Sequence, residues 1–316
     1  GAIGLIGHAL GDALFYGSVW WSWVFPEAVF GIAVGLFAAK FAVKEGGYAD
    51  SRKDNKGYNM CREFAEKNGT PEKPICYSIC EWGLNQPWKW GAKAGNLWRT
   101  TMDIKPNYPS LLYCYELNVR LYKSAQPGGW NDPDMLEVGV GSLTMEENKS
   151  HFTLWCMMAA PLILGNDVRK FLKEDGTVDT DNKVLEILTN KNLIAIDQDK
   201  LGKQAKRIFT DGVSDILVKP LENGEIALCF FNKGNTQREM SVTFNKLHND
   251  IYVNLPIVDE YVAKDLWTNE ETTVKEKISA SVAPHGVMVY KIKSKFFRCN
   301  FFKCFYYEIM IFNTRY

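Results

Sequence analysis

The fold of this chain is decided by the stretch GGWNDPDML, residues Gly128–Leu136. This stretch places two aspartates after a tryptophan at the end of a short apolar run. Two upstream segments, Tyr77–Trp82 and Leu97–Ile104, likewise supply carboxylates, an arginine and tryptophans. Indole rings cover the apolar face of a pyranose, while carboxylates bind its hydroxyls or act as acid, base and nucleophile in glycoside cleavage. Together the three segments predict a carbohydrate-cleaving enzyme.

Apolar runs that end in polar residues recur on both sides of this stretch. Four strands are predicted from them: 74–79, 98–104, 128–134 and 160–165. Two helical segments lie between these strands, a short one at 90–97 and an amphipathic one at 146–158. Strands that alternate with helices, with polar groups gathered after the strand ends, predict a parallel α/β sheet or barrel. The first strand, 74–79, is apolar enough to be expected in the interior.

The pattern changes after residue 205. The run Asp215–Phe231 consists of two apolar segments on either side of Asn223-Gly224, and Asn-Gly between apolar runs is the strongest local signal for a hairpin. Three further short strands of alternating polarity are predicted: 240–244, 265–267 and 287–292. Residues 206–293 are therefore predicted to form an antiparallel β domain that follows a parallel unit at 47–205.

The two ends of the chain differ from these domains. Residues 1–46 are apolar, and only three charged side chains occur before residue 44. The cleanest apolar run, Ala28–Ala39, is shorter than the roughly 20 residues of a membrane-spanning helix, so no membrane span is expected. Residues 294–316 form an aromatic tail. Neither end is expected to belong to the two domains.

Charge and cysteine spacing exclude other classes of protein. Lys and Arg total 37, as do Asp and Glu, so no charge excess points to nucleic acid or to an anionic membrane as a partner. The eight cysteines include no CxxC pair and no Cys/His spacing that suits zinc, so no metal site is expected. Two triplets, at Asn68 and Asn148, are glycosylation sequons.

Five motifs follow one another in a characteristic order. They are CEWG at 80–83, WRTTMDI at 98–104, GGWNDPDML at 128–136, APL at 160–162 and IAIDQDKLG at 194–202. In this order they resemble the α-galactosidases, or melibiases, of glycoside hydrolase family 27. The resemblance covers about 47–292. It implies a partial (β/α)8 barrel, made of the C-terminal strands, followed by an antiparallel β domain.

The resemblance also implies an activity and a set of partners. Members of the family are retaining enzymes that remove terminal α-linked galactose from oligosaccharides or glycoconjugates, and they need no metal or organic cofactor. They are secreted or lie in lysosomes or vacuoles, and their cysteines form disulfides. The resemblance leaves a homo-oligomer open. These properties are expectations for the present chain.

Site residues are implied at the matching positions. Asp103 matches the general acid/base of the family, and Arg99 matches the arginine that contacts the sugar. Four residues match the walls of the galactose pocket: Glu81, Trp82, Asp134 and Met135. A bare Asp-Pro-Asp is usually a turn, and Asp132 is expected to be structural. His151 and His285 are expected to be packing or surface residues.

One required carboxylate is missing. A retaining enzyme needs two carboxylates about 5 Å apart. In the family the nucleophile belongs to a Lys-aromatic-Asp-Asn/Gly-Cys motif directly before the residue that matches Gly47. This chain has AVKEGG at 42–47, without that aspartate and without the cysteine that would be the expected partner of Cys80. We therefore expect weak activity or none.

Two alternatives remain open. An α-N-acetylgalactosaminidase would need room for an acetamide beside the 2-position of the sugar, and Glu81 argues against that space. A non-catalytic or defective carbohydrate-binding remnant would keep the pocket residues and lack the nucleophile.

Overall fold

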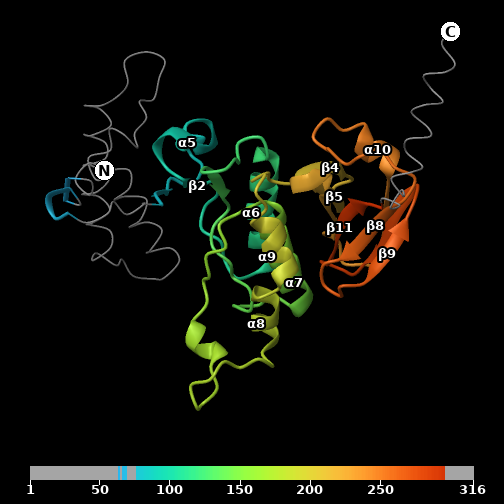
Figure 1. The fold of residues 1–316 in the computed structure, drawn as a ribbon. Coiled ribbons are helices and arrows are strands. Elements are labelled where there is room, and N and C mark those ends of the chain that lie inside the picture. Colours follow the sequence, from blue (N-terminus) through green and yellow to red (C-terminus); the bar gives the residue numbers. More distant parts are fainter. Residues whose placement is uncertain (1–62, 65, 70–75, 296–316) are drawn as a thin grey trace, which may run out of the picture. The chain divides into compact units, whose positions relative to one another are not determined.

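The computed structural model describes residues 63, 64, 66–69 and 76–295 (Figure 1). A parallel sheet with its helices comes first, and an antiparallel β domain follows it. This order confirms the predicted fold class. The predicted end segments 1–46 and 294–316 lie outside the described residues, except for residues 294 and 295.

Three short parallel strands form the first sheet, in the order β1-β2-β3. Their bounds are Ser78–Ile79, Leu97–Arg99 and Trp130–Asp132. The predicted strand at 160–165 is wrong as a regular strand, because it is reduced to a single parallel bridge between Leu136 and Leu164. The first strand was expected in the interior, but Ser78 is exposed. Among the described residues β1 pairs with β2 alone, so one edge of it has no strand beside it.

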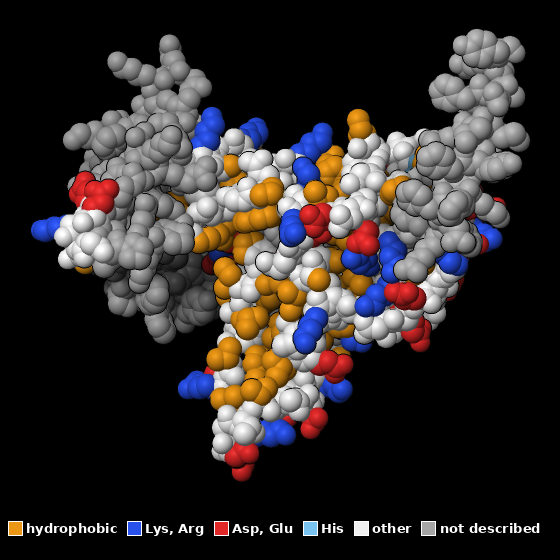
Figure 2. Space-filling view, viewed as in Figure 1, with side chains coloured by type: hydrophobic (Ala, Val, Ile, Leu, Met, Phe, Trp, Pro, Cys, Tyr) orange, Lys and Arg blue, Asp and Glu red, His pale blue; other side chains and the backbone are white. Residues whose placement is uncertain are grey.

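Apolar side chains are exposed near both ends of this short sheet. Tyr77 is 40% exposed, and Ile163 and Leu164 are 52% and 42% exposed. On the face seen in Figure 2, hydrophobic side chains form a band across the middle of the described part. Parallel strands are normally buried on both faces of their sheet, so exposed apolar side chains beside these strands are unusual.

Helices connect the strands and pack beside them. The α-helices are α5 Gly91–Ala94, α6 Tyr108–Asn118, α7 Met145–Met157, α8 Lys183–Leu188 and α9 Lys191–Asp197. Short 3-10 turns lie at Pro87–Lys89, Val119–Leu121 and Val168–Phe171. The start of α7 is fixed by a capping box, in which Thr144 and Glu147 satisfy each other's backbone amides. The predicted link at 90–97 and the helix near 146–158 are thus confirmed.

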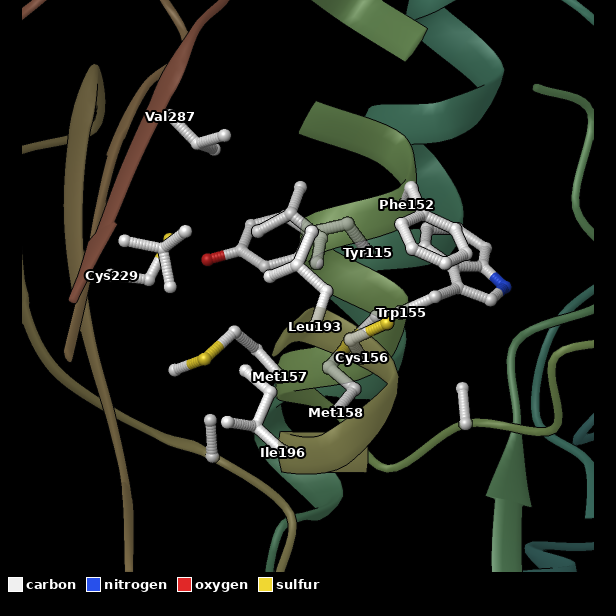
Figure 3. Packing of buried hydrophobic residues seen from close by; sticks show 14 of the residues in the cluster. Tyr115, Phe152, Trp155, Cys156, Met157, Met158, Leu193, Ile196, Cys229 and Val287 are labelled. Atoms are coloured by element: carbon white, nitrogen blue, oxygen red, sulfur yellow. The ribbon is translucent and has the colours of Figure 1, made fainter. Parts of the chain in front are cut away.

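The expected amphipathic character of α7 is wrong. Polar residues such as Asn148, Ser150 and Thr153 are as buried as the apolar ones. The reason is that α7 lies between the helices α8 and α9 and the strands β5, β6 and β11 of the second domain. Figure 3 shows the core that results, with Phe152 and Trp155 of α7 beside each other and with Tyr115 of α6 pointing toward Cys229 on the β domain side. One hydrophobic core therefore joins the two domains.

Burial of Asn148 also bears on glycosylation. Its side chain is 1% exposed, accepts the amide of Gly139 at 2.6 Å and donates to the carbonyl of Leu143 at 3.2 Å. A glycan needs an accessible side chain, so the sequon at Asn148 cannot be used in this fold.

The second domain is antiparallel, as predicted. Its strands are β4 Lys206–Thr210, β5 Ser214–Pro220, β6 Ile226–Asn232, β7 Arg238–Thr243, β8 Tyr261–Asp265, β9 Glu271–Val274, β10 Lys277–Val282 and β11 Val287–Ser294. Six form one sheet in the order β4-β5-β6-β11-β8-β9, and β10 pairs with β7. A second apolar cluster, which includes Phe230, Val242 and Ile278, holds the two sheets together. The short helix α10, Phe244–His248, follows β7.

The hairpin at Asn223-Gly224 is confirmed. Strands β5 and β6 pair from Ser214↔Asn232 to Pro220↔Ile226, and a 3-10 turn at Glu222–Gly224 connects them. Asn223 and Gly224 have φ values of 64° and 71°, which asparagine and glycine adopt more readily than other residues. The strand expected at 265–267 is displaced: β8 ends at Asp265, whose Oδ1 accepts the amide of Trp267 at 2.7 Å and turns the chain there.

The end of α9 yields a prediction about pH. Asp197 is 7% exposed, and burial raises its pKa to about 6, against the opposing charge of Lys219. Because this value lies above the ordinary 3.8, the folded state binds more protons than the unfolded state between about pH 4 and 6. Ionisation of Asp197 should thus reduce stability as the pH rises through that window.

We expect Asp197→Asn to stabilise the protein at pH 7, by up to about 3 kcal/mol for a shift of about two units, and to have little effect at pH 4. Thermal unfolding at the two pH values measures the difference. Asp181→Asn is the matched control, because Asp181 is exposed, and it should change neither midpoint. An equal effect of Asp197→Asn at both pH values would contradict the assignment.

Candidate active site

The candidate site lies at the carboxyl ends of the three parallel strands. Arg99 is the last residue of β2, Asp132 is the last residue of β3, and Glu81 and Trp82 follow β1. Because the carboxyl ends of parallel strands meet at one edge of a sheet, residues distant in sequence come together there. Barrel enzymes have their catalytic groups at this edge.

Arg99 joins two of the predicted site residues. Its Nη2 lies 2.9 Å from Oδ1 of Asp103 and 2.8 Å from Oδ2 of Asp134. The arginine side chain is 12% exposed, the Asp134 side chain is 9% exposed and the Asp103 side chain is 72% exposed. The three residues form a unit that we call the Arg99 fork. Arg99 and Asp134 are the buried members of the fork. Asp103 is its exposed member and is accessible to a ligand.

Asp134 is held from several directions. Its backbone has φ of 87°, a conformation that is uncommon for residues other than glycine, although aspartate adopts it more readily than most. Its Oδ2 accepts the amide of Ile104 at 2.7 Å, its Oδ1 accepts the amide of Met135 at 2.9 Å, and its carbonyl accepts Nε1 of Trp155 at 2.7 Å. Met135 is 37% exposed. A bent backbone therefore brings the Asp134 carboxylate to Arg99 and leaves Met135 accessible beside it.

Asp132 is the residue that sequence reasoning placed outside the site. It is 4% exposed, and its Oδ1 accepts the amide of Asp134 at 2.9 Å. Burial raises the pKa of Asp132 to about 6, while the hydrogen bond from Asp134 and the charge of Arg99 act to lower it. Asp132 is the first aspartate of Asp-Pro-Asp, and its bond to the amide two residues later is the turn interaction that this motif indicates.

Glu81 and Trp82 form a turn at the end of β1. The two carboxylate oxygens of Glu81 accept the amide of Asn85 at 3.1 Å and its Nδ2 at 2.6 Å. Trp82 has φ of 58°, and a Cβ at Gly83 would stand 2.4 Å from the carbonyl oxygen of Thr100, so only glycine fits there. The turn thus packs closely on the segment after β2. No hydrogen bond within the described residues joins Glu81 to the Arg99 fork.

The two histidines are packing residues, as expected. His151 is fully buried and accepts the amide of Glu137 at 2.9 Å, and burial lowers its pKa to about 3. His285 lies 2.7 Å from Glu147 and stacks on Tyr108, so it fastens the β domain to α7. Neither residue is part of the Arg99 fork.

The described residues contain neither a disulfide nor a cluster of metal ligands. The cysteines that the structure describes are all free, so none of the disulfides that the resemblance implies is found among them. Across the described residues, no three His, Cys, Asp or Glu side chains are grouped to hold a metal ion. No helix there has the length and apolarity needed to cross a bilayer.

A parallel sheet with three aspartates and an arginine at its carboxyl edge is followed by an antiparallel β domain, and this edge is where barrel enzymes place their functional residues. The chain belongs to the family described as alpha galactosidase A, whose model matches residues 35–199, just over half of the chain. The model of the alpha galactosidase C-terminal beta sandwich domain matches residues 211–292. Residues 1–50 match a third model, that of the S component of an ECF-type riboflavin transporter.

Individual relatives agree with this family. Alpha-galactosidase 2 of Arabidopsis thaliana is 37% identical over 70% of this chain and 52% of its own length. Alpha-galactosidase A of Cellvibrio japonicus is 37% identical over 75% of this chain and 59% of its own. The crystal structure of alpha-galactosidase I from Mortierella vinacea superposes with a TM-score of 0.64 at 29% identity, over 78% of this chain and 64% of that one. The chain thus spans roughly half the length of the two curated relatives.

Proposed function

We propose that the chain carries the acid/base half of an α-galactosidase site, which acts on terminal α-linked galactose. The observation that carries this proposal is the Arg99 fork, in which one arginine joins Asp103 and Asp134 at the carboxyl edge of the sheet. The names of the relatives, which are α-galactosidases, support the choice of sugar.

Each residue of the fork has a task in this proposal. Asp103, exposed and bound to Arg99 through one oxygen only, protonates the departing glycosidic oxygen and later removes a proton from the attacking water. Arg99 presents donors to a carboxylate and a hydroxyl at once. Asp134 accepts hydrogen bonds from sugar hydroxyls, and Met135 covers an apolar part of the ring.

The second carboxylate of a retaining mechanism is not assigned. Asp132 is buried and holds the amide of Asp134, and Asp134 is paired with Arg99, so neither is free to attack the anomeric carbon. Attack needs a carboxylate about 5 Å from Asp103 on the opposite side of the bond. This observation favours a second candidate function, a protein that binds galactose and hydrolyses galactosides slowly or not at all.

Galactose binding and turnover separate the two candidates. We expect the purified chain to hydrolyse an aryl α-galactoside, and the matching N-acetylgalactosaminide, at no more than a trace rate. Calorimetry should nevertheless detect galactose, and Asp134→Asn should weaken that binding about tenfold or more, because the pairing with Arg99 is lost. Asp181→Asn, an exposed control, should bind as the unchanged chain does. Rapid turnover would mean that a nucleophile has been overlooked, and a chain that binds no galactose would remove the basis for a sugar site.

A further inference from the structure

The direction of the Asp134 side chain depends on its own backbone. With φ of 87°, Cβ leaves the chain on the side opposite to the one that an ordinary negative φ would give. In that direction Oδ2 reaches both Arg99, at 2.8 Å, and the amide of Ile104, at 2.7 Å. A relaxed backbone at Asp134 would carry the carboxylate away from both. The left-handed bend is therefore a condition for the Arg99 fork.

Positive φ is unfavourable for a residue with a side chain, so neighbouring groups must hold this bend. The carbonyl of Asp134 is fixed by Trp155 at 2.7 Å, from a fully buried indole. Its amide is fixed by one acceptor, Oδ1 of Asp132, at 2.9 Å. Asp132 is itself anchored, because its carbonyl accepts the amide of Thr100 at 2.8 Å across the sheet. The peptide on the N-terminal side of Asp134 thus depends on the Asp132 side chain.

Burial of Asp132 opposes its ionisation, as its raised pKa shows. A buried carboxylate is unfavourable unless it makes compensating interactions. Here two interactions compensate: the hydrogen bond from the Asp134 amide and the positive charge of Arg99 in the fork. Both compensating groups belong to the candidate site, so the placement of Asp132 serves that site.

We propose that Asp132 is a positioning residue: its side-chain oxygen holds the amide of Asp134 and so aims the Asp134 carboxylate at Arg99 and at the bound sugar. The role requires an acceptor at this position and not a charge. An asparagine can supply the acceptor, whereas alanine and leucine cannot. The part of the proposal that concerns the sugar rests on the proposed function, and the part that concerns Asp134 does not.

The first test reports on Asp134 without a sugar. The Ile104 amide donates to Oδ2 of Asp134, so its hydrogen exchange measures whether the carboxylate stays in place. We expect Asp132→Ala to speed exchange at Ile104 about tenfold or more, relative to the Ala205 amide, which donates to Met157 elsewhere in the core. Asp132→Asn should leave the ratio unchanged. Asp132→Leu keeps the volume without an acceptor, and it replaces the alanine variant if that variant does not fold.

The second test measures galactose affinity by calorimetry on the full chain. Asp132→Ala or Asp132→Leu should lower the affinity about tenfold or more, and Asp132→Asn should stay close to the unchanged chain. Asp265→Ala is the matched control, because Asp265 is 7% exposed and also holds backbone amides, those of Trp267 and Thr268, but in the β domain. It should leave the affinity and the Ile104 exchange ratio as they are.

The outcomes separate the two proposals. Unchanged exchange at Ile104 in the alanine and leucine variants would overturn the positioning role, whatever the sugar does. An asparagine variant as impaired as alanine would overturn it too, because charge and not the acceptor would then matter. A chain that binds no galactose, yet loses Ile104 protection in the alanine variant, would contradict the proposed function and leave Asp132 as the residue that positions Asp134.

Discussion

Replacing Asp103 with Asn is expected to abolish turnover of natural galactosides once the missing nucleophile is supplied. A hybrid supplies it: residues 1–46 are exchanged for the complementary half-barrel of an active α-galactosidase. In that hybrid, Asp103→Asn should lower kcat on raffinose by about 10²–10⁴-fold, because an amide cannot protonate the departing oxygen. Steady-state kinetics of the hybrid and its variant make the measurement.

The leaving group provides the internal control for this experiment. The nitrophenolate of a nitrophenyl galactoside leaves without full protonation. Asp103→Asn should therefore slow formation of the glycosyl intermediate less with this substrate than with raffinose. Asp181→Asn, far from the fork in sequence and exposed, should change neither rate. If the Asn variant hydrolysed raffinose as fast as the hybrid itself, the exposed member of the Arg99 fork would not be the acid.

Local signals in the sequence were sufficient for the β domain hairpin and for the strand ends of the site. Asn223 and Gly224 adopt the positive φ values that their residue types favour, so these two residues between apolar runs predicted the turn without reference to the rest of the fold. The polar groups after β2 and β3 come together because parallel strands share an edge, which the alternation of strands and helices already implied. These features depend on neighbours in sequence or on one topological rule.

Other features depend on packing and could not be predicted in this way. The polar residues of α7 indicated a solvent-facing side, but Ser150 donates to the carbonyl of His285 in the β domain and is fully buried. A partner that only the folded chain supplies determines where this side chain lies. Glu81 is bound through both oxygens by Asn85, four residues later, and its contact with the sugar stays a prediction.

The junction between the domains contains a second cluster of charges, and Asp215 is at its centre. Asp215, in β5, is fully buried; its Oδ2 accepts the hydroxyl of Tyr115 at 2.7 Å, Nη1 of Arg207 at 2.9 Å and Nζ of Lys233 at 3.1 Å. Glu116 of α6 completes the set, at 2.8 Å from Arg207 and 2.7 Å from Lys233. Two carboxylates thus balance two cations between α6 and the sheet.

Asp215→Ala is expected to destabilise the chain by about 3–5 kcal/mol, the usual effect of removing one partner from a buried ion pair. Arg207 and Lys233 would then share Glu116 alone, and the Tyr115 hydroxyl would lose its acceptor. Burial by itself would raise the pKa of Asp215, but the hydrogen bonds and cations around it outweigh burial and hold the pKa below 3.8. The stabilisation is therefore present above about pH 4 and is lost as the pH falls further.

Denaturant unfolding at pH 7 and at pH 3 measures both parts of this prediction. The difference between the unchanged chain and Asp215→Ala should be large at the higher pH and smaller at the lower one. Glu186→Ala serves as the control, because Glu186 is exposed and paired only with Lys183, and exposed pairs contribute little. A loss of stability from Asp215→Ala that is no larger than that from Glu186→Ala would show that the buried cluster does not hold the β domain to α6. If the large effect is found, Asp215 serves the junction between the domains, whereas Asp103 and Asp134 at the strand ends are the acids that we propose act on the sugar.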